Sequence, residues 1–341
     1  MANVEQQTMR LWDYLRGFHA VHLIDTGVRL NLFATLRKSA DGMTAQELAG
    51  ALHVPYVEAW ARTAVAYGLL DGEDGPPPRY KLAPYMDQLL ADPGGPRQLA
   101  PYFSGAADFI AADLRAYPEY FRNGKTHSFQ AHGEAFSDGI AQITGGFHAV
   151  FAKRILPSIP GLKDKLTAGC RILDMGCGAG NLLARIAEAH PTVTCVGVDV
   201  DVHGVALAKK RWAGSPLADR LSIELLDGDS IAYENAFDVA VMFEVLHEIP
   251  VPVRESVLAK CHRALKPGGT LVILDETMPT KLEELRQPQH MLAVQTQYNE
   301  LIWGNVVPTA QQQDQLIAGA GFHDLKRQTV ADLFTLLTAV K

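Results

Sequence analysis

The sequence feature that most constrains the fold is the stretch 171–187, RILDMGCGAGNLLARIA. It starts with a short apolar run, reaches Asp174, passes through Gly176, Gly178 and Gly180, and continues with apolar residues at helical spacing. This order predicts a strand, a glycine-rich turn and a helix. Glycine lets the backbone approach a ligand closely, and the helix N-terminus behind the turn offers unpaired N–H groups. We therefore expect a ligand at this turn.

From residue 168 onward, apolar runs alternate with helical patterns, which is typical of a parallel sheet with helices on both faces. The predicted strands are 171–175, 194–199, 221–228, 237–243, 269–276 and a final pair near 324–330 and 332–340. The predicted fold class is therefore α/β, with a doubly wound, Rossmann-like, seven-stranded sheet behind an N-terminal, mainly helical domain.

The N-terminal part has the pattern of a winged helix. Residues 8–37 predict two helices with a break near Gly27. Thr44 begins a further helix with capping-box spacing, Pro55 begins another, and a turn then leads to a short strand, RYKLAP. The helix that begins at Pro55 is the candidate DNA-recognition helix. It carries one acid, Glu58, and one base, so it has no net attraction for phosphate. We expect a scaffold or dimerisation role.

The chain is long enough for two or three domains, at 341 residues. A Pro/Gly-rich stretch at 91–98 is the best candidate boundary. The expected domains are 1–95, a winged-helix dimerisation domain; 96–167, a helical linker and pocket roof; and 168–341, the ligand-binding domain. Within the linker, His127 and His132 are candidates for ligand contact, although a surface or core position explains either one.

The composition is that of a globular protein whose main partner is not a polyanion. The formal net charge is -7, and no concentrated basic face is apparent. Charges occur throughout the first thirty residues, and no apolar run approaches the ~18 to 20 residues of a membrane helix. The four cysteines show no CxxC spacing and are expected to be reduced core residues. We expect a soluble, cytoplasmic protein without membrane or nucleic-acid partners.

A nicotinamide dinucleotide fits the glycine turn poorly, because its fingerprint is GxGxxG with a pyrophosphate at the helix N-terminus. Here the spacing is GxGxG, and Asp174 would repel a pyrophosphate but suit an ammonium group. Asp199 ends the next strand, where an acid holds a ribose diol. Asp229 and Ser230 follow the third strand and suit an adenine edge. An adenosine carrying an amino acid, S-adenosylmethionine, fits all of these features.

The motifs DMGCGAG, VGVD, DGDS, FDVAVMFEVLHEI and LKPGGTLVILDE resemble the successive motifs of class I S-adenosylmethionine-dependent methyltransferases. Together with the winged-helix region, the chain is similar to the small-molecule O-methyltransferases that dimerise through such a domain. The resemblance implies a homodimer with S-adenosylmethionine as cofactor and a small-molecule acceptor. The candidate cofactor-binding residues are Asp174, Gly176, Gly178, Asp199, Asp229, Ser230 and Glu244.

The resemblance also implies that His247 is the general base, removing a hydroxyl proton as oxygen attacks the sulfonium methyl group. The histidine pKa lies near neutrality, which suits this task. Glu248 and Glu276 are the further catalytic candidates. Nearby pocket-wall candidates are Met291, Tyr298 and Trp303, for which a helix-spaced core is an equally good interpretation.

Acidic residues gather around the predicted acceptor site: Glu244, Glu248, Asp275, Glu276 and Glu300. Buried carboxylates need a cation, a metal or water. One explanation is a positively charged acceptor. The other is a divalent metal, Zn or Fe, held by His247 and an acid or His290. The latter resembles the α-keto acid C-methyltransferases, which use a metal to stabilise an enolate. O-, N- and C-methylation therefore stay open.

Two other classes of protein fit the sequence less well than an enzyme acting on a small molecule. A ligand-sensing winged-helix regulator predicts a basic recognition helix and loss of the base, and neither occurs in the sequence. An RNA methyltransferase is disfavoured by the net charge of -7 and by the lack of a basic accessory domain.

Overall fold

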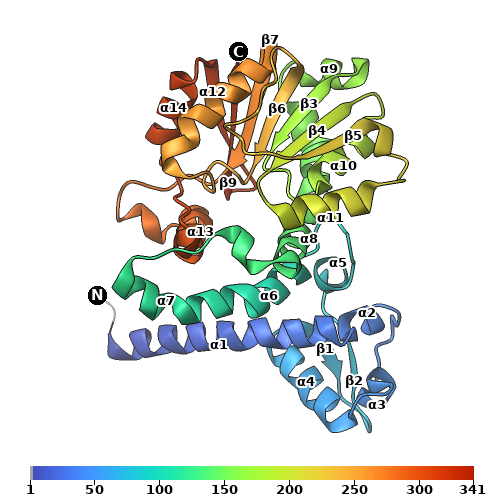
Figure 1. The fold of residues 1–341 in the computed structure, drawn as a ribbon. Coiled ribbons are helices and arrows are strands. Elements are labelled where there is room, and N and C mark those ends of the chain that lie inside the picture. Colours follow the sequence, from blue (N-terminus) through green and yellow to red (C-terminus); the bar gives the residue numbers. More distant parts are fainter. Residues whose placement is uncertain (1–2) are drawn as a thin grey trace. The chain divides into compact units, whose positions relative to one another are not determined.

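The computed structural model describes residues 3–341 and divides into two compact units (Figure 1). The first unit takes in the chain up to Ala112 together with Gln142–Phe147, and the second comprises Asp113–Ala141 and His148–Lys341. The stretch predicted as a linker, 96–167, thus contributes to both units. Among the described residues, no helix has the length and apolar character needed to cross a membrane.

The first unit is mainly helical and contains one two-stranded hairpin. Its elements are α1 (Val4–Arg29), α2 (Leu32–Leu36), α3 (Ala45–Ala49), α4 (Val54–Ala66), β1 (Leu70–Glu73), β2 (Arg79–Leu82), α5 (Met86–Leu90), α6 (Ala100–Gly105) and the π-helical turn η1 (Ala106–Ile110). The capping box predicted for α3 is present, because Thr44 and Glu47 exchange side-chain-to-backbone hydrogen bonds. The helix–helix–hairpin order is the one on which the winged-helix prediction rests.

The predicted helix break near Gly27 is wrong, because α1 continues through this residue to Arg29. A Cβ at position 27 would lie 2.5 Å from the side chains of Phe33 and Trp60. The glycine therefore permits close packing inside a helix. The break falls instead at Asn31, whose φ of 56° lies in the left-handed region.

The second unit is built around a seven-stranded sheet. Its strands are β3 (Arg171–Met175), β4 (Thr194–Asp199), β5 (Leu221–Leu225), β6 (Phe237–Phe243), β7 (Leu265–Asp275), β8 (His323–Val330) and β9 (Phe334–Val340). Its helices are α9 (Leu162–Ala168), α10 (Asn181–Ala189), α11 (Val202–Trp212), α12 (Arg254–Ala264), α13 (Met291–Glu300) and α14 (Ala310–Gly319). Two more, α7 (Ala111–Asn123) and α8 (Glu134–Val150), include residues of both units.

Short 3-10 and π-helical turns complete the second unit. They are η2 (Phe129–His132), η3 (Phe151–Ile155), η4 (Leu156–Ser158), η5 (Ala218–Arg220), η6 (Val251–Val253), η7 (Glu284–Arg286), η8 (Pro288–His290) and η9 (Leu301–Trp303). Several of them lie in the connections that follow the strand ends, where irregular backbone can present side chains to a ligand.

The strand order β5-β4-β3-β6-β7-β9-β8 confirms the predicted α/β fold class. Strands β3 to β7 pair in parallel, whereas β9 is antiparallel to both of its neighbours. From β3 the chain winds outward through β4 to β5 and then returns to place β6 beside β3. This reversal is a topological switch point, and ligands bind outside the carboxyl ends of the strands at such a point.

Helices cover both faces of this sheet, which explains why the central strands are almost wholly apolar. On one face, Val257 and Leu258 of α12 and Ile317 of α14 belong to one buried cluster with residues of the central strands. Figure 1 shows these two helices side by side. On the other face, Leu183 of α10 packs against Gly197 of β4. The core therefore holds the strand ends rigidly at the switch point.

Candidate active site

The glycine-rich turn joins β3 to α10 and has a backbone shape that favours glycine. Gly176, Gly178 and Gly180 have φ values of 76°, 48° and 71°. A Cβ on Gly176 would lie 2.5 Å from Val245, and one on Gly180 would lie 3.0 Å from Trp212. At Gly178 the same atom would meet no heavy atom of residues 3–341 within 4 Å. A ligand can therefore approach the Gly178 backbone closely.

Asp174 lies in β3 immediately before this turn, and its side chain is buried. Neither carboxylate oxygen has a hydrogen-bond partner among the described residues. Burial, and then the charge of Asp199, raise the pKa of Asp174 well above its usual range. An unpartnered buried carboxyl group is costly, so a bound ammonium group would satisfy it.

Asp199 ends β4 and closes the glycine turn. Its Oδ2 accepts the N–H of Gly178 at 2.6 Å, and its Oδ1 accepts the N–H of Asp201 at 2.7 Å. Asp201 in turn caps the N-terminus of α11. Burial raises the pKa of Asp199. Asp199 thus shapes the turn, and its oxygens keep further lone pairs for a ligand hydroxyl.

Asp229 and Ser230 lie on the turn that follows β5. The Ser230 hydroxyl donates to the Asp229 carboxylate at 3.1 Å, and the Ser230 N–H donates to the Asp227 carbonyl. Because β5, β4 and β3 are adjacent parallel strands, Asp229, Asp199 and Asp174 come at one edge of the sheet. The structure therefore brings the predicted cofactor-binding acids to neighbouring strand ends.

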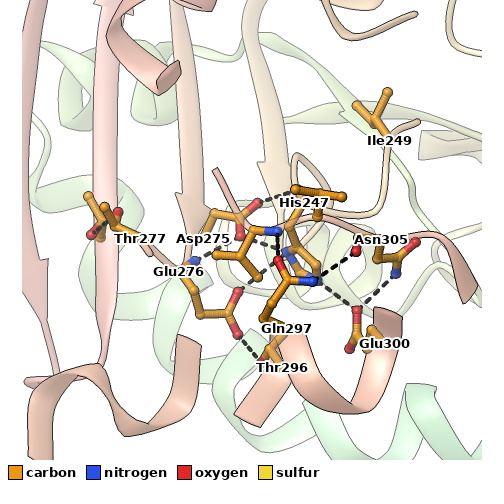
Figure 2. Close-up of polar contacts among 12 residues, drawn as sticks. His247, Ile249, Asp275, Glu276, Thr277, Thr296, Gln297, Glu300 and Asn305 are labelled. Atoms are coloured by element: carbon orange, nitrogen blue, oxygen red, sulfur yellow. Dashed lines mark hydrogen bonds and ion pairs between the residues drawn. The ribbon is translucent and has the colours of Figure 1, made fainter. Parts of the chain in front are cut away.

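His247 follows β6 and is buried among carboxylates (Figure 2). Its Nδ1 lies 2.7 Å from Oδ1 of Asp275 and 3.4 Å from Oε2 of Glu276, both at the end of β7. On the other side of the ring, its Nε2 lies 3.2 Å from Oε2 of Glu300, at the end of α13. We call His247, Glu244, Glu248, Asp275, Glu276 and Glu300 the His247 cluster. Its acids are those that the sequence placed near the acceptor.

Mutual repulsion and burial govern the charges in this cluster. Burial lowers the pKa of His247, but its carboxylate neighbours, Asp275 first, outweigh burial and raise that pKa well above its usual range. Burial would raise the pKa of Asp275, yet the adjacent His247 holds it below its usual value. Burial raises the pKa of Glu276 to about 7. The site therefore favours a positive charge at or near the imidazole.

Glu244 and Glu248 flank the turn that carries His247. Burial and the charge of Glu276 raise the pKa of Glu244 well above its usual range. Burial and the charge of Glu300 do the same for Glu248. Glu244 also adopts a φ of 55°, which is uncommon for a residue with a long side chain. Backbone strain of this kind is concentrated at functional sites.

His290 lies apart from this arrangement. Three groups of His and acidic side chains within residues 3–341 have the spacing to hold a metal: Asp113, His127 and His132; His247, Glu248 and Glu300; and His247, Asp275 and Glu276. His290 belongs to none of them and instead lines a cavity of about 380 Å³ with Thr277, Glu284 and Gln311. The structure does not bring it to His247 as the predicted second histidine ligand.

Two buried residues that support the cluster were not predicted. Thr296 donates its hydroxyl to Oε1 of Glu276 at 2.9 Å. Arg254 donates to the carbonyl oxygens of His247, Ile249 and Val306. Neither residue stands in a recognisable motif, and each is joined to its partner by tertiary folding. Arg254 thereby ties the turn after β6 to the segment after η9.

The comparisons with known proteins agree with this fold. Residues 173–271 match the family model described as a methyltransferase domain, and residues 12–92 match the O-methyltransferase dimerisation domain. A relative from Streptomyces sahachiroi, 3-hydroxy-5-methyl-1-naphthoate 3-O-methyltransferase, is 26% identical over 77% of this chain and 75% of its own length.

Another relative is the ubiquinone/menaquinone biosynthesis C-methyltransferase UbiE of Geobacter sulfurreducens, 36% identical over 33% of this chain. The match spans only 43% of that relative's length. Human N-acetylserotonin methyltransferase, solved in complex with S-adenosylmethionine, has a TM-score of 0.79 at 18% identity. It aligns over 100% of this chain and 99% of its own.

The fold and the family model thus identify a methyltransferase domain built on a Rossmann-like sheet. The chain thus combines a methyltransferase domain over residues 173–271 with an O-methyltransferase dimerisation domain over residues 12–92. The family predicted from the sequence motifs is confirmed.

Proposed function

We propose that this protein transfers the methyl group of S-adenosylmethionine to a hydroxyl oxygen of a small molecule, with His247 as the base. The observation that carries the proposal is the pairing of two features on adjacent strands. Asp174 presents an unpartnered buried carboxyl group on β3, and β6 beside it leads to a histidine that Asp275 holds. A methyl donor and an acceptor thus have separate polar anchors at one switch point.

The residues around the glycine turn fit the donor. Asp174 would accept hydrogen bonds from its ammonium group, and Asp199 would accept those of the ribose hydroxyls. Asp229 and Ser230 would contact the adenine. Glu244 lies in the sequence between these donor-binding residues and His247. The donor, when bound, supplies an electrophilic methyl group. The open space at Gly178 supports close approach of this ligand to the backbone.

Asp275 sets the chemistry of His247. Its carboxylate accepts a hydrogen bond from Nδ1, which keeps one ring proton there, so that in the neutral form of the ring Nε2 is the atom that removes the hydroxyl proton. Asp275 then stabilises the imidazolium that forms. Glu300, 3.2 Å from Nε2, would orient the acceptor hydroxyl at the same atom. Removing this proton makes the oxygen a better nucleophile toward the methyl group.

Metal-assisted C-methylation of an α-keto acid is the second candidate, and a specific observation favours it. Nε2 or Nδ1 of His247 and carboxylate oxygens of Glu248 and Glu300 lie within 4.8 Å of one another. One imidazole and two carboxylates suit a divalent metal. Such a metal, when bound, would polarise the keto group and acidify the adjacent carbon. Glu276 would remain as a candidate base for that carbon's proton.

We also propose that the protein is a homodimer. The match to the O-methyltransferase dimerisation domain supports this assembly. Leu11, Leu15 and Phe18 stand at helical spacing on α1, and each is at least half exposed. A second copy of the chain would cover this apolar face.

Calorimetric titration with S-adenosylmethionine and S-adenosylhomocysteine tests donor binding. Donor, protein and a panel of hydroxyarenes and α-keto acids would then be incubated together, and mass spectrometry would locate the methyl group. O-methylation that survives chelator treatment supports the first candidate, and C-methylation abolished by the chelator supports the second. No binding of either compound would contradict both candidates.

A further inference from the structure

A group of two histidines and one aspartate lies outside the residues assigned above. Asp113 is on α7, His127 lies just before the short turn η2, and His132 is the last residue of that turn. Nε2 of His127 is 3.1 Å from Nε2 of His132, which is 3.0 Å from Oδ2 of Asp113. Nε2 of His127 is also 3.9 Å from Oδ1 of Asp113. We call these three residues the Asp113 cluster.

The hydrogen bonds of His132 place its Nε2 between two neighbours that a bound cation would satisfy together. Its Nδ1 lies 2.9 Å from the carbonyl oxygen of Phe129, which only accepts, so Nδ1 carries a hydrogen. Its Nε2 then faces a carboxylate oxygen and the Nε2 of His127 at nearly equal distances. A proton on Nε2 points along one direction and serves one of these neighbours well. A metal ion between the three atoms serves all of them.

The outer contacts hold the three side chains in this orientation. The Tyr120 hydroxyl lies 3.3 Å from Nδ1 of His127, and Trp303 donates its indole N–H to Oδ2 of Asp113 at 2.9 Å. With the contact of His132 to the Phe129 carbonyl, each ring presents Nε2 inward and is held through its other nitrogen. Metal-binding histidines are typically oriented in this way by an outer partner.

We propose that Asp113, His127 and His132 bind a divalent transition-metal ion, best Zn²⁺. Ligands about 2.05 Å from a tetrahedral ion lie about 3.3 Å apart, and the separations of His132 Nε2 from His127 Nε2 and from Asp113 Oδ2, 3.1 and 3.0 Å, lie near this value. Two imidazoles and one carboxylate are a suitable donor set for zinc. The His127 side chain is 27% exposed, so the cluster can be reached from solvent on that side.

The ion would stabilise η9, the segment that follows Glu300 beside the acceptor site. The His127 N–H donates to the Ile302 carbonyl at 2.9 Å, and Trp303 donates to Asp113. Both partners lie in η9, directly after Glu300, which faces His247. The metal would therefore fix the segment that positions Glu300, without contacting the reacting atoms. This role does not depend on whether the acceptor is methylated on oxygen or on carbon.

The test uses the full-length protein, stripped with a chelator and titrated with Co²⁺ and Zn²⁺. We expect about one Co²⁺ per chain with the visible absorption of a tetrahedral site, displaced by Zn²⁺. His127→Ala and His132→Ala should abolish this spectrum, whereas His247→Ala should retain it. His323→Ala is the matched control, because His323 also pairs with an aspartate but is exposed.

X-ray absorption of the zinc-loaded protein counts the imidazole ligands without any variant, so misfolding of a variant cannot obscure the answer. Two imidazoles support the Asp113 cluster, whereas the His247 cluster supplies one. Absence of a cobalt spectrum and of any zinc-induced rise in Tm would overturn the proposal. So would a spectrum that is lost only in His247→Ala. Neither readout requires turnover, so they are separable from failure of the proposed methyl transfer.

Discussion

Nδ1 of His247 lies 2.7 Å from Oδ1 of Asp275, and both side chains are buried. Asp275 also accepts the backbone N–H groups of His247 and Glu276. One carboxylate therefore fixes the ring, its tautomer and the backbone that carries it. Positioning of this kind is expected where a proton must be taken from a defined direction.

Asp275→Asn should reduce kcat by about 10²–10⁴-fold, because the amide cannot stabilise the imidazolium. Donor affinity should stay unchanged, since the donor anchors lie on other strands. Steady-state rates and calorimetry with S-adenosylhomocysteine measure the two effects. Asp238→Asn is a control, as this partly buried acid pairs with Lys266 at the opposite end of β6. Equal activity of the Asp275 variant and the parent would contradict the proposed base.

Asp174→Asn should weaken S-adenosylmethionine binding by about 10- to 100-fold, equivalent to about 1.4–3 kcal/mol. The Tm of the ligand-free protein should not fall, because the Asp174 carboxyl group has no partner among the described residues. Calorimetry and thermal unfolding measure these changes. Asp227→Asn, in the exposed turn after β5, should leave affinity unaltered. A variant that loses stability but keeps its affinity would refute this role for Asp174.

Gly27→Ala should lower the free energy of unfolding by about 1–3 kcal/mol, because the new methyl group overlaps Phe33 and Trp60. Gly17→Ala, in the same helix, is the matched control. A Cβ at position 17 meets no described heavy atom within 4 Å, so this change should stabilise the protein by about 0.5–1 kcal/mol. Urea unfolding of both variants provides the comparison, and effects of equal sign would count against the packing argument.

His148 should make the protein less stable in mild acid. Its side chain is buried against Phe243, its Nδ1 has no partner among the described residues, and burial lowers its pKa to about 3. The unfolded chain takes up this proton near pH 6.5, so stability is full above that pH and declines as pH falls toward 3. The loss is about 2 kcal/mol between pH 7.5 and 5.

His148→Phe should remove that part of the pH dependence, while His323→Ala, at an exposed histidine, should not. Urea unfolding at pH 5 and 7.5 measures the difference. An unchanged slope in the His148 variant would assign the acid sensitivity to other groups.

Leu11→Glu combined with Leu15→Glu should shift the protein from dimer to monomer, because two charges would enter the proposed α1 interface. Sedimentation velocity over a range of concentrations measures the change. Arg10→Glu alters an exposed charge on the same helix and should have a much smaller effect. A parent protein that sediments as a monomer would rule out the homodimer.

The sequence predicted those parts of the fold that local patterns determine. The buried strands are continuous apolar runs, and the turn of Gly176 and Gly178 needs left-handed backbone, so both could be located in advance. Glu244, Glu248, Asp275 and Glu276 could be grouped because they lie at the ends of β6 and β7, which are adjacent strands. The sequence does not indicate whether they hold a donor, an acceptor or a metal, because the type of residue does not determine its ligand.

Contacts between distant segments lay beyond such patterns. A glycine such as Gly27 predicts a helix break when only the local sequence is considered. The actual reason for the glycine, its packing against Phe33 and Trp60, depends on tertiary structure. The residue type of His290 suits a metal ligand. Helix α13, however, places Glu300 and not His290 beside the imidazole of His247. His127 and His132 gained their significance only when α7 brought Asp113 to them.

The uncompensated carboxyl group of Asp174 has a further consequence for the amount of protein that a cell maintains. A ligand that satisfies this group binds the native chain and not the unfolded one, so it stabilises the fold by about 2.7 kcal/mol at 100 times its Kd. Degradation that proceeds through opened chains would slow accordingly. Under the proposed function, the supply of methyl donor would therefore set the abundance of the protein as well as its rate.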